Sequence, residues 1–466
     1  MKAYSINTKA GVSICTPPDI HLMTPYILLE QEQWFEPEVQ FIQDFLQPGM
    51  KALDIGACFG VYALPMAKAV GPEGEVFAFE PCAQVREYLD ESARQNNLEN
   101  VQIIPLALAD RSGQVKLKTA KTPELNAMSL SGDSGAAEHV EAIMLDAWWA
   151  ENGCPRIDVV KVDVNGYEAR VIQGGHAFFT QTSPVVVVSI KDNDQLNHQT
   201  IKALMDHGYG LYQYLPELEA LAPFDHQAKP DAYLLNLLAV KSDVTSKLQE
   251  KGIIAQGAFE APGPQAGYWE KCLSAMPWTA SFLPTWQQNV QNNAFRDYLE
   301  ALDFVCATQE LDAIGTTKFA QAFQATQRLM MIYKKSQGAS AGPVALTLSR
   351  ALNMLGLREE AVQVLEILVE SIKNGKEKDF SLPFLSPLPR FDQMPVQDSV
   401  EEWIAAKCNE SLIFLRSLSG YFNSSLDRQL LQLLHENPER CLESQRRLAM
   451  IMMRQGQKVQ IRPDSR

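Results

Sequence analysis

The residues of this chain best suited to bind a ligand lie in a glycine-bearing turn that follows a short apolar run. Residues 52–55, Ala-Leu-Asp-Ile, have the composition of a buried strand. Gly56 and Gly60 lack a Cβ, which lets the backbone turn tightly and approach a ligand closely. The helix expected from about residue 61 to residue 70 would direct its free N–H groups toward the same turn. The segment therefore predicts a binding site at the carboxyl end of a parallel strand.

A carboxylate after the next predicted strand indicates what the ligand contains. Residues 75–79 form a second apolar run, and Glu80 follows directly after it. An acidic residue at this place, about 20 residues or more beyond the turn, accepts hydrogen bonds from the hydroxyls of a ribose. Glu80 therefore favours a nucleoside-containing ligand over the simpler interpretation of a turn that binds nothing.

The spacing of the glycines distinguishes between nucleoside cofactors. A dinucleotide fold needs Gly-x-Gly-x-x-Gly, whereas this turn reads Asp54-x-Gly56-x-x-x-Gly60. The Asp54 carboxylate would repel a pyrophosphate, and it suits a ligand that carries cationic groups. S-adenosylmethionine has a sulfonium, an ammonium and a ribose, so we expect S-adenosyl-L-methionine as the cofactor. An NAD-linked oxidoreductase is the disfavoured alternative, because one glycine of its fingerprint is missing.

Charged side chains near a later strand are candidates for proton transfer. Residues 157–164 predict the fourth strand, with Asp163 at its carboxyl end. An enzyme that methylates an alcohol must align donor and acceptor and remove a proton. Asp163 is the first candidate for this base, and capping of the turn that follows it is the alternative interpretation. Lys161 points to the same face and could pair with Asp163, and Glu168 could instead cap the next helix.

Together these patterns give the candidate site residues. The expected catalytic residues are Asp163, Lys161 and Glu168. The expected cofactor-binding residues are Asp54, Gly56, Ala57, Cys58, Gly60, Glu80, Ala107 and Asp163. No metal site is expected, because no Cys-x-x-Cys pair occurs and the other acidic residues near the strand ends read as solvated loop residues.

Composition limits the class of protein and its partners. The chain has 466 residues, 46% of them apolar, which suits two or three domains with sizeable cores. Its net charge of −15 and the absence of a long Lys/Arg run argue against a general nucleic-acid or anionic-membrane binder. No run approaches the roughly 18 apolar residues that span a membrane, and no signal-peptide segment is recognised. The cysteines are scattered as in reduced proteins, so we expect a soluble cytoplasmic protein.

Hydrophobic patterning divides the chain into two parts. Up to about residue 240, strands alternate with helices, which predicts an α/β domain whose mostly parallel sheet ends in one antiparallel strand. We expect this domain at residues 1–245, a Gly- and Pro-bearing linker at residues 246–285 and a helical domain at residues 286–466. Residues 121–138 are rich in Ser, Gly and other small residues, and they predict a mobile loop over the site.

Several local predictions in the α/β part are specific enough to test. Pro25 and the two prolines before it are expected to break any helix near the N-terminus, so the first helix is predicted at residues 39–46. A single strand is predicted at residues 101–108, and an edge strand with alternating exposure at residues 114–117.

Helical periodicity in the last part of the chain predicts at least one helical hairpin. Residues 345–365 place small and apolar side chains where a tetratricopeptide-type repeat has them, and a weaker second copy is expected at residues 437–456. Two loose copies are fewer than the roughly three that make a solenoid self-sufficient. An ordinary helical domain is therefore an equally good interpretation.

Three motifs, in this order, resemble those of FkbM-type S-adenosylmethionine-dependent methyltransferases. They are Leu53-Asp54-Ile55-Gly56-Ala57-Cys58-Phe59-Gly60-Val61-Tyr62, Phe79-Glu80-Pro81, and Val160-Lys161-Val162-Asp163-Val164-Asn165-Gly166-Tyr167-Glu168. The resemblance covers about residues 24–241 and implies a Rossmann-like class I methyltransferase domain with a seven-stranded, mostly parallel sheet. Cys58 and Asn165 stand where the family usually has Asn and Glu.

The resemblance also implies a reaction. The expected function is O-methylation of a hydroxyl on a sugar, a glycan or a small natural product. The alternative is a catalytically inactive S-adenosylmethionine-binding or scaffold protein whose helical domain recruits a protein partner. The two departures from the family pattern and the repeat-like hairpin motivate that alternative.

Overall fold

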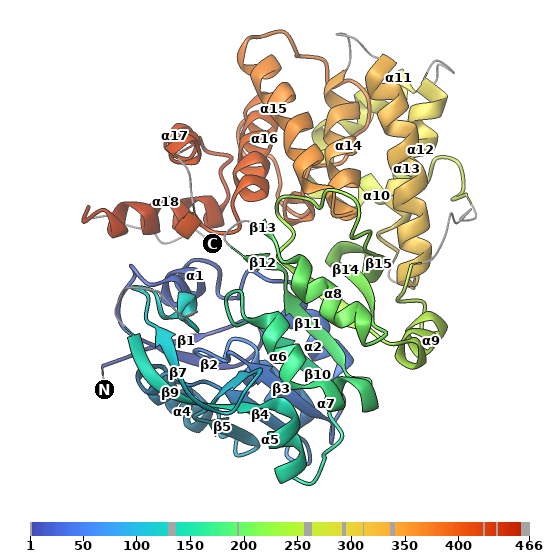
Figure 1. Ribbon diagram of the computed structural model, residues 1–466. Coiled ribbons are helices and arrows are strands. Elements are labelled where there is room, and N and C mark those ends of the chain that lie inside the picture. The colour runs from blue at the N-terminus through green and yellow to red at the C-terminus, as the bar shows by residue number, and fades with distance from the viewer. Residues whose placement is uncertain are drawn as a thin grey trace. The chain divides into compact units, whose positions relative to one another are not determined.

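The computed structural model divides the chain into two compact units (Figure 1). The first unit comprises Met1–Tyr214, Pro223–Ala228 and Leu235–Leu248, and the second comprises Leu215–Ala222, Lys229–Leu234 and Gln249–Arg466. The structure describes residues 2–128, 137–192, 195–255, 263–290, 295–310, 312–335, 341–422, 425–434 and 437–457.

The first unit is an α/β structure, and it contains the strands of a large mixed sheet except for Leu215 and residues 220–222. The strands of this sheet are β3 (Lys51–Ile55), β4 (Glu75–Phe79), β5 (Val101–Ile104), β10 (Val159–Val162), β11 (Val185–Ser189), β14 (Gly210–Leu215), β15 (Ala220–Pro223) and β16 (Asn236–Val240). Their order is β15-β14-β16-β11-β10-β3-β4-β5. The strands from β5 to β11 are parallel, and β16 is antiparallel to both of its neighbours, as the alternating pattern predicted. The sheet has eight strands, whereas the family resemblance implied seven, and the sequence analysis did not predict β15.

The central strands are apolar because both faces of the sheet are covered. Every residue of β10 is buried, and so are the four valines of β11, as expected for β-branched side chains in a covered parallel sheet. The helices of this unit are α1 (Met23–Gln31), α2 (Glu38–Phe45), α3 (Ala63–Val70), α4 (Ala83–Gln95), α5 (Leu145–Glu151), α6 (Glu168–Gly174), α7 (His176–Gln181), α8 (His198–Asp206) and α9 (Ser242–Glu250). Helix α3 packs on β3, β4 and β5 beside α2, whereas α5, α6, α7 and α8 pack on one another.

The connectivity fixes where a ligand can bind. The chain runs outward from β3 through β4 to β5, and then returns to place β10 on the other side of β3. The point between β3 and β10 is therefore a topological switch point, and ligands of open α/β sheets bind there, outside the carboxyl ends of the strands.

Smaller sheets complete the first unit. A hairpin joins β1 (Tyr4–Asn7) to β2 (Ser13–Thr16), and a second one joins β12 (Lys191–Asp192) to β13 (Gln195–Leu196). A further sheet has the order β6-β9-β7-β8, formed by β6 (Ala107–Ala109), β7 (Gly113–Lys118), β8 (Ala127–Met128) and β9 (Ala137–Met144).

Two local predictions in this unit were wrong. Helix α1 includes Pro25, which the sequence analysis treated as a helix breaker. Pro25 is the third residue of α1, where its missing N–H has no partner within the helix to lose. The single strand predicted at residues 101–108 is two strands in two different sheets, β5 and β6, and Pro105 lies between them. The segment predicted as an edge strand is β7, which belongs to the smaller sheet.

The second unit is helical in its described residues. Its helices are α10 (Tyr268–Ser274), α11 (Leu283–Asn289), α12 (Arg296–Ala307), α13 (Gly315–Lys335), α14 (Ala341–Met354), α15 (Arg358–Lys373), α16 (Val400–Arg416), α17 (Ser425–Leu433) and α18 (Leu442–Arg454). From α12 to α18, each helix packs against the next one along the chain. The hairpin predicted at residues 345–365 corresponds to α14 and α15, whereas residues 437–456 contain one helix, α18.

An aromatic cluster organises the core of this unit and corrects the predicted linker. Trp278 and Trp403 stack with ring centroids 4.6 Å apart, and Phe384 packs against Trp278 at 5.2 Å. Trp278 and α10 lie within residues 246–285, so the described part of that range is packed structure. The Gly- and Pro-bearing composition reflects the short turns between these helices.

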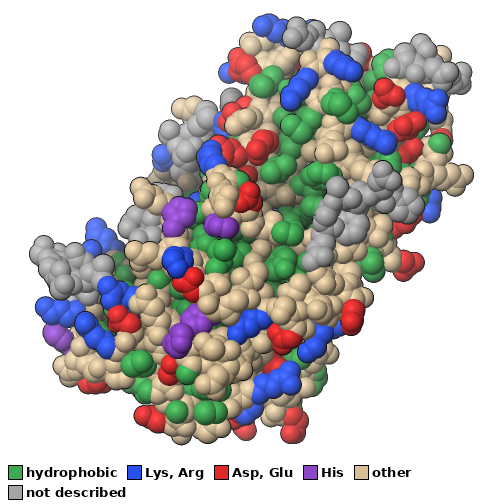
Figure 2. Space-filling model, turned by 45° about the vertical axis from the view of Figure 1, so that its right-hand side comes forward, with side chains coloured by type: hydrophobic (Ala, Val, Ile, Leu, Met, Phe, Trp, Pro, Cys, Tyr) green, Lys and Arg blue, Asp and Glu red, His purple; other side chains and the backbone are tan. Residues whose placement is uncertain are grey.

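The distribution of surface charge and the hydrophobicity of the helices bear on the classes of partner that the composition disfavoured. On the face shown in Figure 2, Lys and Arg side chains are interspersed with Asp and Glu side chains and do not form one basic patch. Within the described residues, no helix is both long enough and apolar enough to cross a membrane.

Candidate active site

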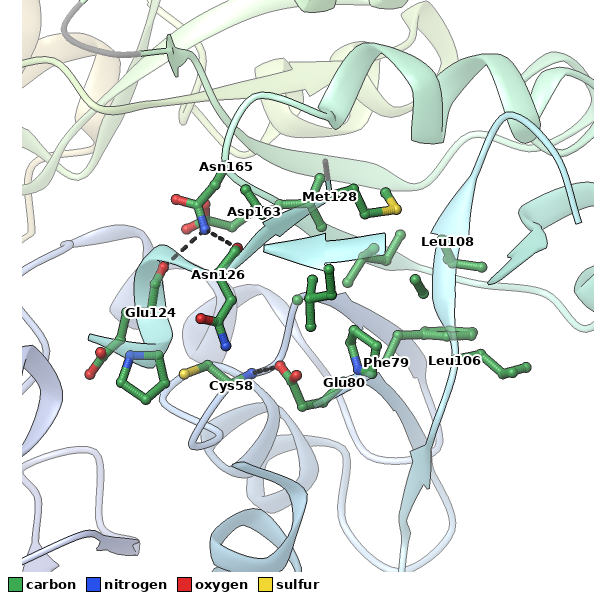
Figure 3. A pocket seen from close by; sticks show the side chains of 18 residues that line it. Cys58, Phe79, Glu80, Leu106, Leu108, Glu124, Asn126, Met128, Asp163 and Asn165 are labelled. Atoms are coloured by element: carbon green, nitrogen blue, oxygen red, sulfur yellow. Dashed lines mark hydrogen bonds between the residues drawn. The ribbon is translucent and has the colours of Figure 1, made fainter. Parts of the chain in front are cut away.

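A pocket opens at the switch point of the first unit, where β3, β4 and β10 end (Figure 3). Its polar lining includes Glu80 after β4 and Asp163 after β10. Its apolar lining is formed by Phe79, Leu106, Ala107, Leu108, Leu117 and Met128. The pocket thus has a carboxylate from each of two strand ends and an apolar wall contributed mainly by the residues around β6.

Glu80 is held by backbone N–H groups of the glycine-bearing turn and of the segment before α4. One carboxylate oxygen, Oε2, accepts the Cys58 N–H at 3.0 Å, and the other, Oε1, accepts the Cys82 N–H at 2.8 Å. Cys58 can present its N–H in this way because its φ is 46°, in the left-handed region. The Glu80 side chain is 8% exposed, and it lines the pocket. Its carboxylate therefore has a fixed position and free lone pairs on the pocket side.

Gly56 brings the ends of β3 and β10 into contact. Its φ is 89°, and a Cβ built on it would lie 2.1 Å from the backbone oxygen of Asp163. The Gly56 N–H donates to the Phe79 oxygen at 3.0 Å, which joins the same turn to β4. Gly60 has a different role, because a Cβ there would meet Leu89 of α4 at 2.5 Å. Gly56 therefore allows the backbone to approach the end of β10 at the pocket, and Gly60 allows it to approach helix α4.

Replacing Gly56 with alanine is expected to destabilise the protein by about 2–5 kcal/mol. A positive φ costs about 1–2 kcal/mol for a residue with a Cβ, and overpacking against a rigid backbone oxygen adds about 1–3 kcal/mol. The matched control is Gly71→Ala, because Gly71 also has a positive φ, 64°, but an added Cβ would meet nothing within 4 Å. Denaturant melts of both variants measure the difference. Equal losses of stability would contradict a tight contact at Gly56.

Asp54 lies beneath the turn instead of lining the pocket. It is 2% exposed, it is paired in register with Lys161 of the neighbouring strand, and its Oδ2 has no hydrogen-bond partner among the described residues. Burial raises the pKa of Asp54 to about 7, against the opposing charge of Lys161. Asp54 thus places a buried carboxyl group with a raised pKa below the glycine turn.

Lys161 and Asp163 form the ion pair that the sequence suggested. Their Nζ and Oδ2 atoms are 3.5 Å apart, and Lys161 is 1% exposed whereas the Asp163 side chain is 37% exposed. The ammonium also donates to Asn236 Oδ1 at 2.9 Å and lies 3.9 Å from Glu36 Oε2. Burial raises the pKa of Asp163, and the neighbouring ammonium opposes this shift. Asp163 reaches the pocket, whereas Lys161 supports it from behind.

Glu168 organises the turn after β10. It is fully buried, and its Oε1 accepts the N–H groups of Val164 at 3.0 Å and Gly166 at 3.1 Å. Its Oε2 accepts from Asn197 Nδ2 at 3.3 Å. Glu168 is not among the residues that line the pocket. The geometry gives it a role in capping the turn before α6, whereas the sequence analysis had offered capping of the helix that follows as the alternative.

Asn165 ties a loop to the pocket rim. Its φ is 50°, and its Nδ2 donates to the backbone oxygens of Glu124 and Asn126, both at 2.9 Å (Figure 3). These contacts place residues 123–128 along the pocket, within the loop predicted at residues 121–138. Residues 129–136 of that loop lie outside the described residues, and residues 137–138 begin β9.

The structure therefore separates the predicted site residues into two groups. Those that line the pocket are Gly56, Cys58, Glu80, Ala107 and Asp163. Those that lie beside or beneath it are Asp54, Ala57, Gly60, Lys161 and Glu168. The sequence analysis missed Glu36, Tyr62 and Asn236, whose side chains surround Lys161 or contact its partners. Asn236 carried a sequence signal, as a polar residue within an apolar run, whereas Glu36 lies among other Glu and Gln residues. Among the residues that the structure describes, no group of three His, Cys, Asp or Glu side chains is arranged to hold a metal ion.

The cofactor-free protein is expected to lose thermal stability as the pH rises from 6 to 8.5, with a melting temperature about 5 °C lower at the upper end. Burial raises the pKa of four carboxyl groups to about 7, namely Glu38, Asp54, Glu80 and Glu168. The folded protein thus holds protons that the unfolded chain releases near pH 4, so their stabilisation is present at low pH and lost as the pH passes 7. Thermal melts across this range measure the effect, and Glu168→Gln should flatten the curve. A melting temperature that rises with pH would contradict it.

Comparison with known proteins agrees with this site. The family model described as the methyltransferase FkbM domain matches residues 54–211. The chain is similar to the 2-O-methyltransferase NoeI of Sinorhizobium fredii, with 26% identity over 218 residues, which cover 42% of this chain and 84% of that protein.

Solved structures of methyltransferases also match part of the chain. The methyltransferase FkbM of Methylobacillus flagellatus matches with 14% identity and a TM-score of 0.28, over 44% of this chain and 50% of that chain. An S-adenosylmethionine-dependent O-methyltransferase of Thermotoga maritima matches with 17% identity and a TM-score of 0.28, over 51% and 77% of the two chains. The family match, at the residues that build the pocket, identifies residues 54–211 of this chain as a methyltransferase domain of the FkbM family.

Proposed function

We propose that this protein transfers a methyl group from S-adenosylmethionine to a hydroxyl group of a sugar, a glycan or a small natural product. The observation that carries the proposal is that Glu80 and Asp163, from two different strand ends, line one pocket at the switch point of the sheet. One carboxylate is suited to hold the cofactor, and the other is suited to accept a proton from the methyl acceptor.

The residues around the pocket fit the chemical groups of the cofactor. The free lone pairs of Glu80 suit the ribose hydroxyls, and Phe79, Leu106 and Leu108 offer an apolar wall for the adenine. Asp54, with its unpartnered buried oxygen, adds negative charge that complements a cationic ligand. When bound, the cofactor supplies a methyl group activated by a sulfonium.

The proposed catalytic role of Asp163 is to take the hydroxyl proton of the acceptor. Asp163 is the partly exposed member of its ion pair, so an acceptor in the pocket can reach its carboxylate. Lys161 is fully buried and its pKa is raised by the surrounding carboxylates in spite of its own burial. It therefore stays charged and is unsuited to be a base. Its proposed role is to fix and stabilise the Asp163 carboxylate.

The similarity to a 2-O-methyltransferase supports a hydroxyl acceptor, although the pocket alone does not select one class of alcohol. An inactive, scaffold-like protein is the second candidate, with the helical unit as its partner-binding part. The intact pairing of Lys161 with Asp163 favours the enzyme, because a chain that only binds the cofactor does not need a buried ammonium behind a pocket carboxylate.

Two experiments test the proposal. Titration calorimetry with S-adenosylmethionine and with NAD decides the cofactor, and tight NAD binding with no response to S-adenosylmethionine would refute the assignment. Labelled methyl transfer into a cell extract tests catalysis, and mass spectrometry of glycans and metabolites from a deletion strain identifies the acceptor. The expected signature is a loss of one CH₂ unit from a hydroxylated compound.

A further inference from the structure

The ammonium of Lys161 is shared among three oxygens, and only one of them belongs to a pocket residue. Its Nζ lies 2.9 Å from Asn236 Oδ1, 3.5 Å from Asp163 Oδ2 and 3.9 Å from Glu36 Oε2. An ammonium has three N–H donors, which these three acceptors match in number. Lys161 is 1% exposed, so water does not compete for the charge. The carboxylates of Glu36 and Asp163, at similar distances, therefore share the electrostatic stabilisation that the Lys161 ammonium provides.

Glu36 is fixed in this position by a second contact. Its Oε2 accepts the hydroxyl hydrogen of Tyr62 at 2.6 Å, and the Tyr62 ring faces the Lys161 ammonium, 4.8 Å from the ring centroid. Glu36 is 8% exposed and comes from the segment just before α2. Both Glu36 and Asn236 lie outside residues 54–211, the range that matches the family model. Segments that flank the matched domain thus complete the surroundings of Lys161.

We propose that Glu36 is a positioning residue for methyl transfer, which shares the Lys161 ammonium with Asp163 and thereby keeps the Asp163 carboxylate basic enough to take the acceptor proton. This inference rests on the proposed function. If Lys161 paired with Asp163 alone, the Asp163 carboxylate would be strongly stabilised as an anion and would be a poor base. A base is most effective when its proton affinity suits the working pH, and a second carboxylate on the same cation moves Asp163 in that direction.

The direction of the effect follows from the charges around Asp163. The titratable groups that face it are Lys161 of β10, Glu36 before α2, Asp54 of β3, Cys58 and Tyr62 of the turn after β3, and Glu168 of α6. Lys161 is the cation of this set. Besides burial, which is the largest cause, the charge of Glu36 raises the pKa of Asp163, while Lys161 lowers it. Replacing Glu36 with glutamine should therefore lower the pKa of Asp163.

The primary test needs no cofactor. Carboxyl ¹³C-aspartate labelling and NMR titration follow Asp163 in the free protein, with Asp163→Asn used to assign its signal. The expected result is a titration midpoint about one pH unit lower in Glu36→Gln than in the wild type. With the cofactor and an acceptor, the acidic limb of the pH profile of kcat/KM should move the same way. Turnover above that limb should fall about three- to tenfold, with the KM for the cofactor unchanged.

Two variants control for charge and for folding. Glu38→Gln removes a buried carboxylate two residues away, which faces Asn236 Nδ2 at 3.4 Å instead of Asp163, so the Asp163 midpoint should stay within about 0.3 pH unit of the wild type. Glu36→Asp keeps the charge and should retain most of the wild-type midpoint even if Glu36→Gln folds poorly. An unchanged midpoint in a folded Glu36→Gln protein would overturn the inference. Full turnover by Asp163→Asn would instead refute the proposed role of Asp163, so the two failures are distinguishable.

Discussion

Replacing Glu80 with alanine is expected to weaken S-adenosylmethionine binding by about two to four powers of ten. Hydrogen bonds from two ribose hydroxyls to one carboxylate are charge-assisted and contribute about 1.5–3 kcal/mol each, and about 1.4 kcal/mol is tenfold in affinity. The structure adds a second consequence, because Glu80 also accepts the N–H groups of Cys58 and Cys82. Alanine leaves both donors unpaired, so the free protein should lose about 1–3 kcal/mol of stability. Titration calorimetry and denaturant melts measure the two effects separately.

Two further variants isolate the cofactor contact at Glu80. Glu80→Gln keeps one oxygen that can accept a backbone N–H, and it should bind the cofactor more tightly than Glu80→Ala but less tightly than the wild type. Glu141→Gln removes the same charge from an exposed position on β9 and should bind like the wild type. Unchanged S-adenosylmethionine affinity in a folded Glu80→Ala protein would overturn the cofactor assignment.

Replacing Asp163 with asparagine is expected to lower turnover by about 10²- to 10⁴-fold, because a positioned general base contributes a factor of this size. The cofactor affinity should change by less than about fivefold, since the ribose contacts are assigned to Glu80. The substitution keeps the shape of the side chain, and the Lys161 ammonium retains Glu36 and Asn236 as partners. Single-turnover methyl transfer together with equilibrium binding of the cofactor measures the two quantities.

Glu168→Gln is the matched control for Asp163→Asn. It neutralises a carboxylate of the same turn that caps Val164 and Gly166 and does not line the pocket. Its main effect should be on stability, with a smaller loss of turnover than Asp163→Asn causes. A variant Asp163→Asn that turns over at the wild-type rate would leave the pocket without its proposed base.

The sequence predicted the site best where function depends on neighbours along the chain. The strand, the turn at Gly56 and the carboxylate at Glu80 were predicted because short continuous apolar runs mark the buried strands and a glycine marks the turn. The ion pair of Lys161 and Asp163 was predicted for the same reason, because residues two apart in a strand point to one face. In the structure, Gly56, Glu80 and Asp163 line one pocket.

Local patterns failed where the outcome depended on position within an element or on packing. Helix α1 tolerates Pro25 because this proline lies in its first turn. Composition alone does not predict where a helix begins relative to a proline. Trp278 lies in a stretch whose glycines and prolines predicted a linker, yet it stacks on Trp403, a residue distant in sequence. Burial against a remote partner outweighs local propensity in such segments.

The sequence by itself determined the strand–turn–helix unit, the acidic residue that follows the next strand, and the two charged residues at the end of β10. Only the tertiary structure decided which distant side chains surround Lys161. Glu36 and Asn236 come from the two ends of the α/β part, and both reach the Lys161 ammonium of β10. Periodicity fixes the face on which a residue lies within its own element, but the order of the strands in the sheet determines which faces meet.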